Sequence, residues 1–203
     1  MKKTILVALV AVTTASFANA ASIAWRNNAT AFTKGSDSLA GSAAILIVTD
    51  KGAAAPTATW ENGSLKLAGG SYLGQTTLGS DGKVATTTLS ITGDWSDGKI
   101  SVLGGAAYGE EATVDTYGYG TANAKDYYML VFDSATITES SSYALSSLTS
   151  KAPTSKTGSL ALAFAGTSFA SSAFTPVKAI PEPASVALLA LGLAALGLKR
   201  KVA

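Results

Sequence analysis

The 203-residue chain contains neither cysteine nor histidine. Without cysteine it can form no disulfide bond, so packing alone must hold an exported fold together. Without histidine it lacks the commonest general base and the commonest neutral metal ligand. These two absences exclude Ser–His, Cys–His and His–zinc sites before any motif is considered.

Charged side chains are also scarce, and their overall balance is misleading. They make up 14% of the chain, with a net charge of +2. Five of the basic residues lie at the two ends, and between Ala21 and Ile180 ten Lys and Arg stand against twelve Asp and Glu. Nucleic-acid binding requires a concentrated basic surface, so we expect no nucleic-acid partner.

The N-terminus has the order of a secretory signal peptide. Two lysines precede eight apolar residues, 5–12, and the small residues Ala18 and Ala20 follow. This order predicts a signal-peptide helix over residues 1–20 that signal peptidase removes after Ala20. The apolar stretch is too short for a retained membrane helix, and no cysteine follows it that a lipid could modify.

A proline-rich linker, residues 178–183, lies near the other end and contains Pro181, Glu182 and Pro183. Proline cannot continue a helix and pushes the preceding residue towards extended geometry. We therefore expect Glu182 to be presented on a short extended peptide.

An apolar run from Ala184 to Leu198 follows the linker and ends at three basic residues, Lys199, Arg200 and Lys201. Fifteen helical residues rise about 22 Å, whereas the bilayer core is about 30 Å thick. Snorkelling of the basic side chains or local thinning can cover the difference. We predict a transmembrane helix with a basic cytoplasmic tail over residues 184–203; a buried Ala/Leu helix is the alternative.

This three-part tail resembles the PEP-CTERM sorting signal of Gram-negative bacteria, in its Pro-Glu-Pro motif, its apolar run and its basic end. The resemblance covers about an eighth of the chain. It implies processing by an exosortase, a membrane transpeptidase-like cysteine enzyme, after transient anchoring in the inner membrane. It also implies delivery to the cell surface or to the exopolysaccharide of a biofilm matrix.

Residues 21–177 are predicted to form one secreted all-β domain. They are rich in Gly, Ser, Thr and Ala, and no segment keeps a 3.6-residue period. Short apolar or Thr-rich runs alternate with Gly and Asp-Gly turn signals. The pattern favours a single β-sandwich-like domain of nine to eleven short antiparallel strands.

Particular segments predict particular strands. The apolar runs 43–49 and 127–132 indicate central strands. Residues 83–92 and 99–103, joined by Asp97-Gly98, indicate a hairpin, and Asn62-Gly63 indicates a turn. Residues 160–164 indicate a late strand with its large residues inward, and a short edge strand is expected within 110–121. Two segments stay open: 71–78 fits a helix or a loop, and 135–139 fits a strand or a loop. Residues 140–159 are expected to be flexible, with one helical turn near Tyr143.

Three polar groupings are weak candidates for chemistry. Asp94 and Asp97 could hold Ca²⁺ with backbone carbonyls, but hairpin turns use Asp for their own geometry. Glu110-Glu111 with Asp115 could serve a glycosidase, but adjacent strand residues point to opposite faces. Ser-x-x-Lys spacing occurs at 80–83 on a predicted turn without its companion motifs. We therefore expect no catalytic residue, cofactor or metal.

Aromatic residues offer one alternative, a sugar-stacking surface, because their faces suit shallow ligands. Tyr117 and Tyr119 form the group expected to be most exposed, and the other members are Trp25, Trp60, Trp95, Tyr72, Tyr108, Tyr127 and Tyr128.

The sequence thus predicts a non-enzymatic exported protein with a structural or adhesive role at the cell surface or in the matrix. The alternatives are a carbohydrate-binding module for matrix glycans and an enzyme that uses Asp and Glu alone.

Overall fold

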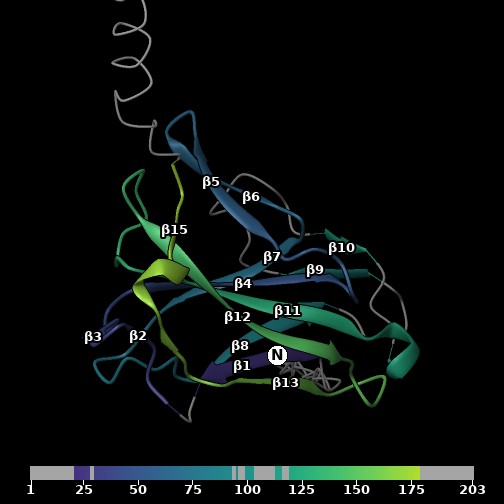
Figure 1. Cartoon of the computed structure of the whole chain (residues 1–203). Helices are drawn as coiled ribbons and strands as arrows, with labels where there is room; N and C mark the ends of the chain where they lie inside the picture. The colour runs from purple at the N-terminus through teal and green to yellow at the C-terminus, as the bar shows by residue number, and fades with distance from the viewer. Residues whose placement is uncertain are drawn as a thin grey trace, which may run out of the picture.

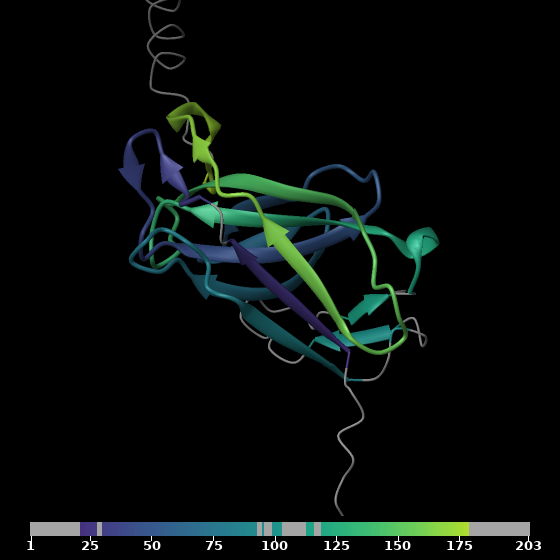
Figure 2. The same cartoon turned by 90° about the horizontal axis from the view of Figure 1, so that it is seen from below.

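The computed structural model describes residues 21–27, 30–92, 95, 99–102, 113–115 and 119–178. These residues form fifteen strands and two short 3₁₀ helices, which confirms the all-β prediction. Two five-stranded sheets pack together, as the predicted sandwich requires (Figures 1 and 2). Within the described part, no helix has the length and apolar character to cross a membrane. The helices predicted at 1–20 and 184–203 lie outside it.

The first sheet has the strand order β10-β9-β8-β1-β13. Its members are β10 (Thr113–Asp115), β9 (Lys99–Val102), β8 (Thr87–Thr92), β1 (Ser22–Asn27) and β13 (Ser159–Phe164). The predicted hairpin is confirmed by the antiparallel β8–β9 pair, and the predicted edge strand is β10. β13 alternates exposed and buried residues, with its leucines and Phe164 inward.

The pairing of β1 with β13 is parallel, so the prediction of purely antiparallel strands is wrong. The preceding strand, β12, carries the chain back to the end of the sandwich where β1 begins. β13 therefore starts beside Ser22 and runs in the same direction as β1, in register from Ser22–Ser159 to Asn27–Phe164.

The second sheet has the order β15-β12-β11-β4-β7. Its members are β15 (Thr175–Pro176), β12 (Ser142–Lys151), β11 (Lys125–Phe132), β4 (Ala43–Asp50) and β7 (Ser71–Thr77). The two apolar runs in the sequence are its interior strands β4 and β11, as predicted. Seven consecutive residues of β4 are buried, because both of its faces are covered.

Two separate cores cover those two faces. The inner core lies between the sheets and contains Leu46, Met129 and Trp25. The outer core lies on the far face and contains Ile45, Leu130, Phe132, Tyr143 and Val177.

A hairpin of β5 (Thr57–Glu61) and β6 (Ser64–Ala68) covers the outer core. Its turn residues Asn62 and Gly63 both have positive φ, 52° and 79°, as the predicted two-residue turn requires. The buried Tyr143 hydroxyl accepts a 3.0 Å bond from the Ala58 N–H and ties β5 to the sheet below.

A small sheet closes one end of the sandwich. It consists of β14 (Ser168–Phe169), β2 (Thr33–Lys34) and β3 (Asp37–Ser38). Phe169 stacks on Phe32 at 5.7 Å and meets the edge of Phe174 at 5.8 Å. The two short 3₁₀ helices are η2 (Thr121–Asn123), before β11, and η3 (Ser171–Ala173), which leads into β15.

Two segments differ from the prediction. Residues 71–78, expected to be a helix or loop, contain β7. Tyr72 lies in the outer core and Leu73 in the inner core, as neighbours in a strand covered on both faces do. The pairing with β4 passes from Tyr72 to Gly74 and leaves Leu73 as an extra residue, and this irregularity interrupts the alternation. Residues 140–159, expected to be flexible with a helical turn near Tyr143, contain the ten-residue strand β12. The segment 135–139 is a loop.

The double burial of β4 gives a direct test. Ile45 and Leu46 are both fully buried, but in different cores. We expect Ile45→Ala and Leu46→Ala each to lower the free energy of unfolding by about 2–5 kcal/mol in urea titrations. An Ile45→Ala variant as stable as the wild type would show that the outer face of the sheet is uncovered.

Candidate functional site

The most clearly built site in the described fold is the point where the chain leaves it, at β15. Thr175 and Pro176 pair with Tyr143 and Ser142 at the edge of the second sheet. Val177 follows and is only 2% exposed, within the outer core. Burying a valine side chain fully contributes about 1.5–3 kcal/mol, so the chain is anchored up to the beginning of the predicted linker.

Two backbone hydrogen bonds fix Val177 between separate elements. Its N–H donates to the Ser141 carbonyl at 3.0 Å, and its carbonyl accepts from the Trp60 N–H at 2.7 Å. Lys178 forms an ion pair with Glu139, although both side chains are more than half exposed. β15 therefore ends against both the β5–β6 hairpin and the 133–141 loop (Figure 1).

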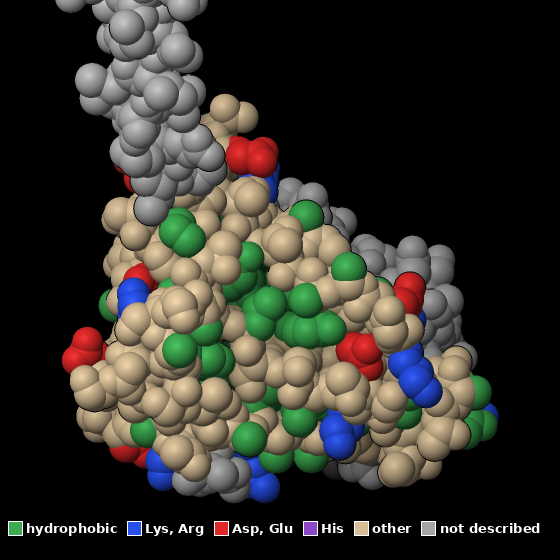
Figure 3. Space-filling model, in the orientation of Figure 1, with side chains coloured by type: hydrophobic (Ala, Val, Ile, Leu, Met, Phe, Trp, Pro, Cys, Tyr) green, Lys and Arg blue, Asp and Glu red, His purple; other side chains and the backbone are tan. Residues whose placement is uncertain are grey.

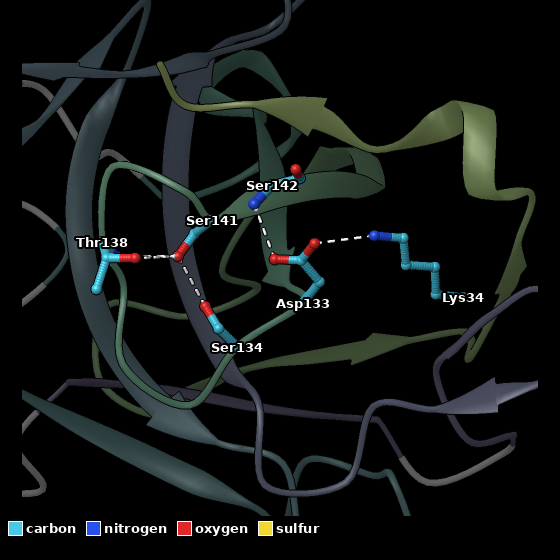
Figure 4. A network of polar contacts seen from close by, with 6 residues as sticks. All are labelled: Lys34, Asp133, Ser134, Thr138, Ser141 and Ser142. Atoms are coloured by element: carbon cyan, nitrogen blue, oxygen red, sulfur yellow. Dashed lines mark hydrogen bonds and ion pairs between the residues drawn. The ribbon is translucent and has the colours of Figure 1, made fainter. Parts of the chain in front are cut away.

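The 133–141 loop is shaped by a polar network around Ser141 (Figure 4). The Ser141 hydroxyl lies 2.8 Å from the Ser134 hydroxyl and accepts from the Thr138 N–H at 2.9 Å. The Ser141 N–H donates to the Thr138 carbonyl at 3.1 Å. Because Ser141 is only 2% exposed, these bonds form away from water and fix the carbonyl that holds Val177.

Asp133 joins this loop to the small sheet. One of its carboxylate oxygens accepts from the Ser142 N–H at 2.8 Å, and the other pairs with the Lys34 ammonium at 2.9 Å (Figure 4). The same ammonium lies 4.7 Å from the centre of the Phe174 ring, directly before β15. Lys34 thus contacts both sides of the exit, through an ion pair and a cation–π contact.

A depression of about 450 Å³ lies beside the exit, between the hairpin, β7 and the loop. It is lined by Trp60, Ser64, Leu65, Gln75, Ala135, Thr136 and Ile137. We call this depression the exit groove. Its walls mix apolar and hydroxyl or amide side chains, and none carries a charge.

Next to the β5–β6 hairpin, below it in the view of Figure 3, the outer core is not completely covered. Apolar side chains gather there in a hollow over β4, β11 and β12 (Figure 3). Leu67, Tyr128 and Leu145 are the partly buried members of the outer core on these strands and on β6.

Four of the seven described members of the predicted aromatic platform are buried, so the described rings do not form one shared sugar-binding surface. Trp25, Trp95 and Tyr127 are fully buried in the inner core. Tyr72 is 8% exposed, and burial raises the pKa of its phenol above the ordinary value. Large aromatic rings contribute most by filling cores, and here that role prevails.

Trp60 and Tyr128 are partly buried at the outer core, and Tyr119 is the most exposed described member, with 44% of its surface exposed. The Lys156 ammonium lies 5.8 Å from its ring centre, and the Asn123 amide donates to its carbonyl at 3.1 Å. Tyr119 lies beyond the start of β11, whereas the exit lies beyond the end of the same strand. Tyr117 lies outside the described residues.

The remaining predicted site residues are placed as follows. Those outside the described residues are Ala18, Ala20, Asp94, Asp97, Tyr108, Glu110, Glu111, Pro181, Glu182, Pro183, Lys199, Arg200 and Lys201. Asp115 ends the edge strand β10. The Ser-x-x-Lys segment at 80–83 is a turn in which the Lys83 N–H donates to the Asp81 carboxylate at 3.1 Å. Across the described ranges, no three His, Cys, Asp or Glu side chains gather as a metal site requires.

Trp60, Asp133 and Ser141 build the exit, but the sequence patterns assigned Trp60 to the aromatic surface and gave Asp133 and Ser141 no site. Asp133 directly follows the apolar run 127–132, but Ser141 stands in a run of four serine or acidic residues with no distinguishing pattern. Its role depends on the turn that brings residue 141 back to residues 134 and 138.

Comparison with protein families finds a match at residues 179–201, described as a PEP-CTERM protein-sorting motif. The chain carries a PEP-CTERM sorting signal. The resemblance found in the sequence is thereby confirmed, and the PEP-CTERM signal begins at the residue after Lys178, where the described fold ends. It implies export, processing by an exosortase and sorting to the cell envelope or surface. No curated protein and no solved structure matches the chain.

The role of Ser141 can be tested against its exposed neighbour. We expect Ser141→Ala to lower the free energy of unfolding by about 1–2 kcal/mol, because the Thr138 N–H loses its acceptor. Hydrogen exchange at the Val177 amide should become faster, since the loop that holds it loosens. Ser140→Ala is the matched control, expected within about 0.5 kcal/mol of the wild type. Equal stability of the two variants would contradict the role given to Ser141.

Proposed function

We propose that this protein is a non-enzymatic component of the cell surface or extracellular matrix, released from its membrane anchor when an exosortase cleaves near Pro181-Glu182-Pro183. The observation that carries the proposal is the PEP-CTERM match at 179–201, directly after an anchored fold boundary. An apolar run at 184–198 would hold the exported chain in the inner membrane until processing.

The position of the fold boundary is consistent with a folded domain that is kept and a sorting signal that is removed. The last residue of the outer core is Val177, and the sorting motif begins two residues later. Cleavage near Glu182 would therefore remove no residue of either core. The mature domain would keep all fifteen strands described here.

A structural or adhesive role for the mature domain is supported by its side chains. Hydroxyl side chains of Ser and Thr face outward along strands such as β12, where they suit hydrated surroundings.

Replacement of Glu182 tests the sorting proposal. We expect Glu182→Ala to prevent removal of the tail, since the charged member of the motif is lost. Intact-mass analysis of the surface fraction should then show loss of the mature species, whereas wild-type protein loses at least residues 199–203. Glu61→Ala, at an exposed glutamate on β5, is the control that should be processed normally. Wild-type surface protein that retains its basic end would refute the proposal.

Glycan binding is the second candidate, favoured only by the exposed ring of Tyr119 beside Lys156. If this ring stacks on sugar, Tyr119→Ala should weaken retention on matrix polysaccharide about two- to tenfold. Tyr117→Ala, at the other predicted contact, should be measured alongside it. Thr121→Ala, at an exposed neighbour, should have no effect. Unchanged retention of both tyrosine variants would exclude this surface.

A further inference from the structure

The distance between the folded domain and the membrane is limited by very few residues. Lys178 is fixed through Val177, and Ala184 begins the apolar run only six residues later. Even a fully extended chain covers about 20 Å in six steps. Glu182 lies four residues beyond Lys178, within about 14 Å of it.

This short span leaves little room for a separate protein layer. The polar interfacial zone of one leaflet occupies about 5–8 Å. The gap between the domain and the lipid headgroups is then at most about 15 Å, close to the 10–12 Å diameter of a single helix. A membrane enzyme that binds the Pro-Glu-Pro motif therefore works within about one helix diameter of the end of the domain from which the chain leaves.

The alternative would be to free more chain by detaching β15. That requires breaking the pairing of Thr175 and Pro176 with β12, withdrawing Val177 from the outer core and separating Lys34 from Phe174. The described structure holds the exit at each of these points, so contact with the intact exit is favoured over detachment.

We infer that the exit groove and its rim are the docking surface for the membrane enzyme that processes the 179–201 signal. This inference rests on the proposed function and names the surface by which the partner recognises the folded part of its substrate.

The exit groove lies directly beside the point where the chain leaves the domain. Trp60 both lines it and donates to the carbonyl of Val177. Thr136 and Ile137 lie on the same short loop as Glu139, the ion-pair partner of Lys178. A partner that holds Glu182 therefore has uncharged groove walls within reach, formed by Trp60, Leu65 and Ile137, with the hydroxyls of Ser64 and Thr136 at their side.

The absence of cysteine makes a site-specific crosslinking test possible. Full-length Thr136→Cys, labelled with a benzophenone maleimide, would be reconstituted with the processing enzyme in lipid vesicles and irradiated. Thr121→Cys is the matched control, because both threonines are exposed and Thr121 lies at the opposite end of β11. We expect at least tenfold more crosslinking to the enzyme from position 136 than from position 121.

Lengthening the linker that follows Lys178 provides a second crosslinking experiment. Twelve Gly/Ser residues inserted between Lys178 and Ala179 add about 19 Å of flexible reach. If the short linker enforces the contact, crosslinking from position 136 should fall at least fivefold, while removal of the tail continues.

Each outcome decides the inference. Equal or absent crosslinking at positions 136 and 121, in vesicles where the tail is removed, would overturn it. Crosslinking from position 136 to lipid alone would overturn it and assign the exit groove to the membrane surface. Undiminished crosslinking from the lengthened chain would overturn the argument from linker length. Failure of the enzyme to remove the tail from unlabelled wild-type protein would refute the proposed function itself, together with the inference that depends on it.

Discussion

Burial of the second sheet on both faces is the constraint on which the rest of the structure depends. β4 and β11 are almost wholly apolar, and a sheet of such strands is stable in water only if both faces are covered. The first sheet covers the inner face. The outer face needs the β5–β6 hairpin, the 133–141 loop and Val177 as well. The last residues of the domain are therefore part of a core and not a loose end.

With no disulfide available, the polar side chains have a specific task in this arrangement. Asp126 is 4% exposed and accepts 2.7 Å bonds from the N–H groups of Gly52 and Ser150, which joins the turn after β4 to the end of β12. At the other end of the sheet, Asp133 accepts a hydrogen bond from the Ser142 N–H and forms an ion pair with Lys34. Carboxylates at both ends of β11 thus connect neighbouring elements through charge-assisted hydrogen bonds and an ion pair.

Sequence patterns predicted those parts of the fold that local composition determines. The runs in β4 and β11, the alternation in β13 and the Asn62-Gly63 turn each carry their own signal, and each is confirmed. β12 and β7 were missed because their identity comes from partners distant in sequence. Ser-rich β12 is a strand because β11 pairs with it along most of its length, and the irregularity in β7 removes its alternation.

The candidate site likewise has one part that the sequence predicts and one part that only the fold assembles. The sorting signal is contiguous and could be found from the sequence alone. The exit is assembled from Lys34, Trp60, Ser141 and Val177, which are brought together only by the fold. No spacing rule connects these positions. Burial of Trp25, Trp95 and Tyr127 likewise depends on the sheets closing over them, so composition could not separate core rings from the exposed Tyr119.

The parallel pairing of β1 with β13 bears on the timing of maturation. Residues separated by 137 positions meet in the first sheet, as the Ser22–Ser159 contact shows. A chain that emerges from a translocation pore with its N-terminus first cannot complete this sheet until about residue 164 has passed through. If the apolar run 184–198 is the membrane anchor proposed above, it follows residue 164 by only about twenty residues. On that proposal, folding and arrest in the membrane would fall within one short interval, and the nascent polypeptide would stay tethered to its own cell while its long-range contacts form.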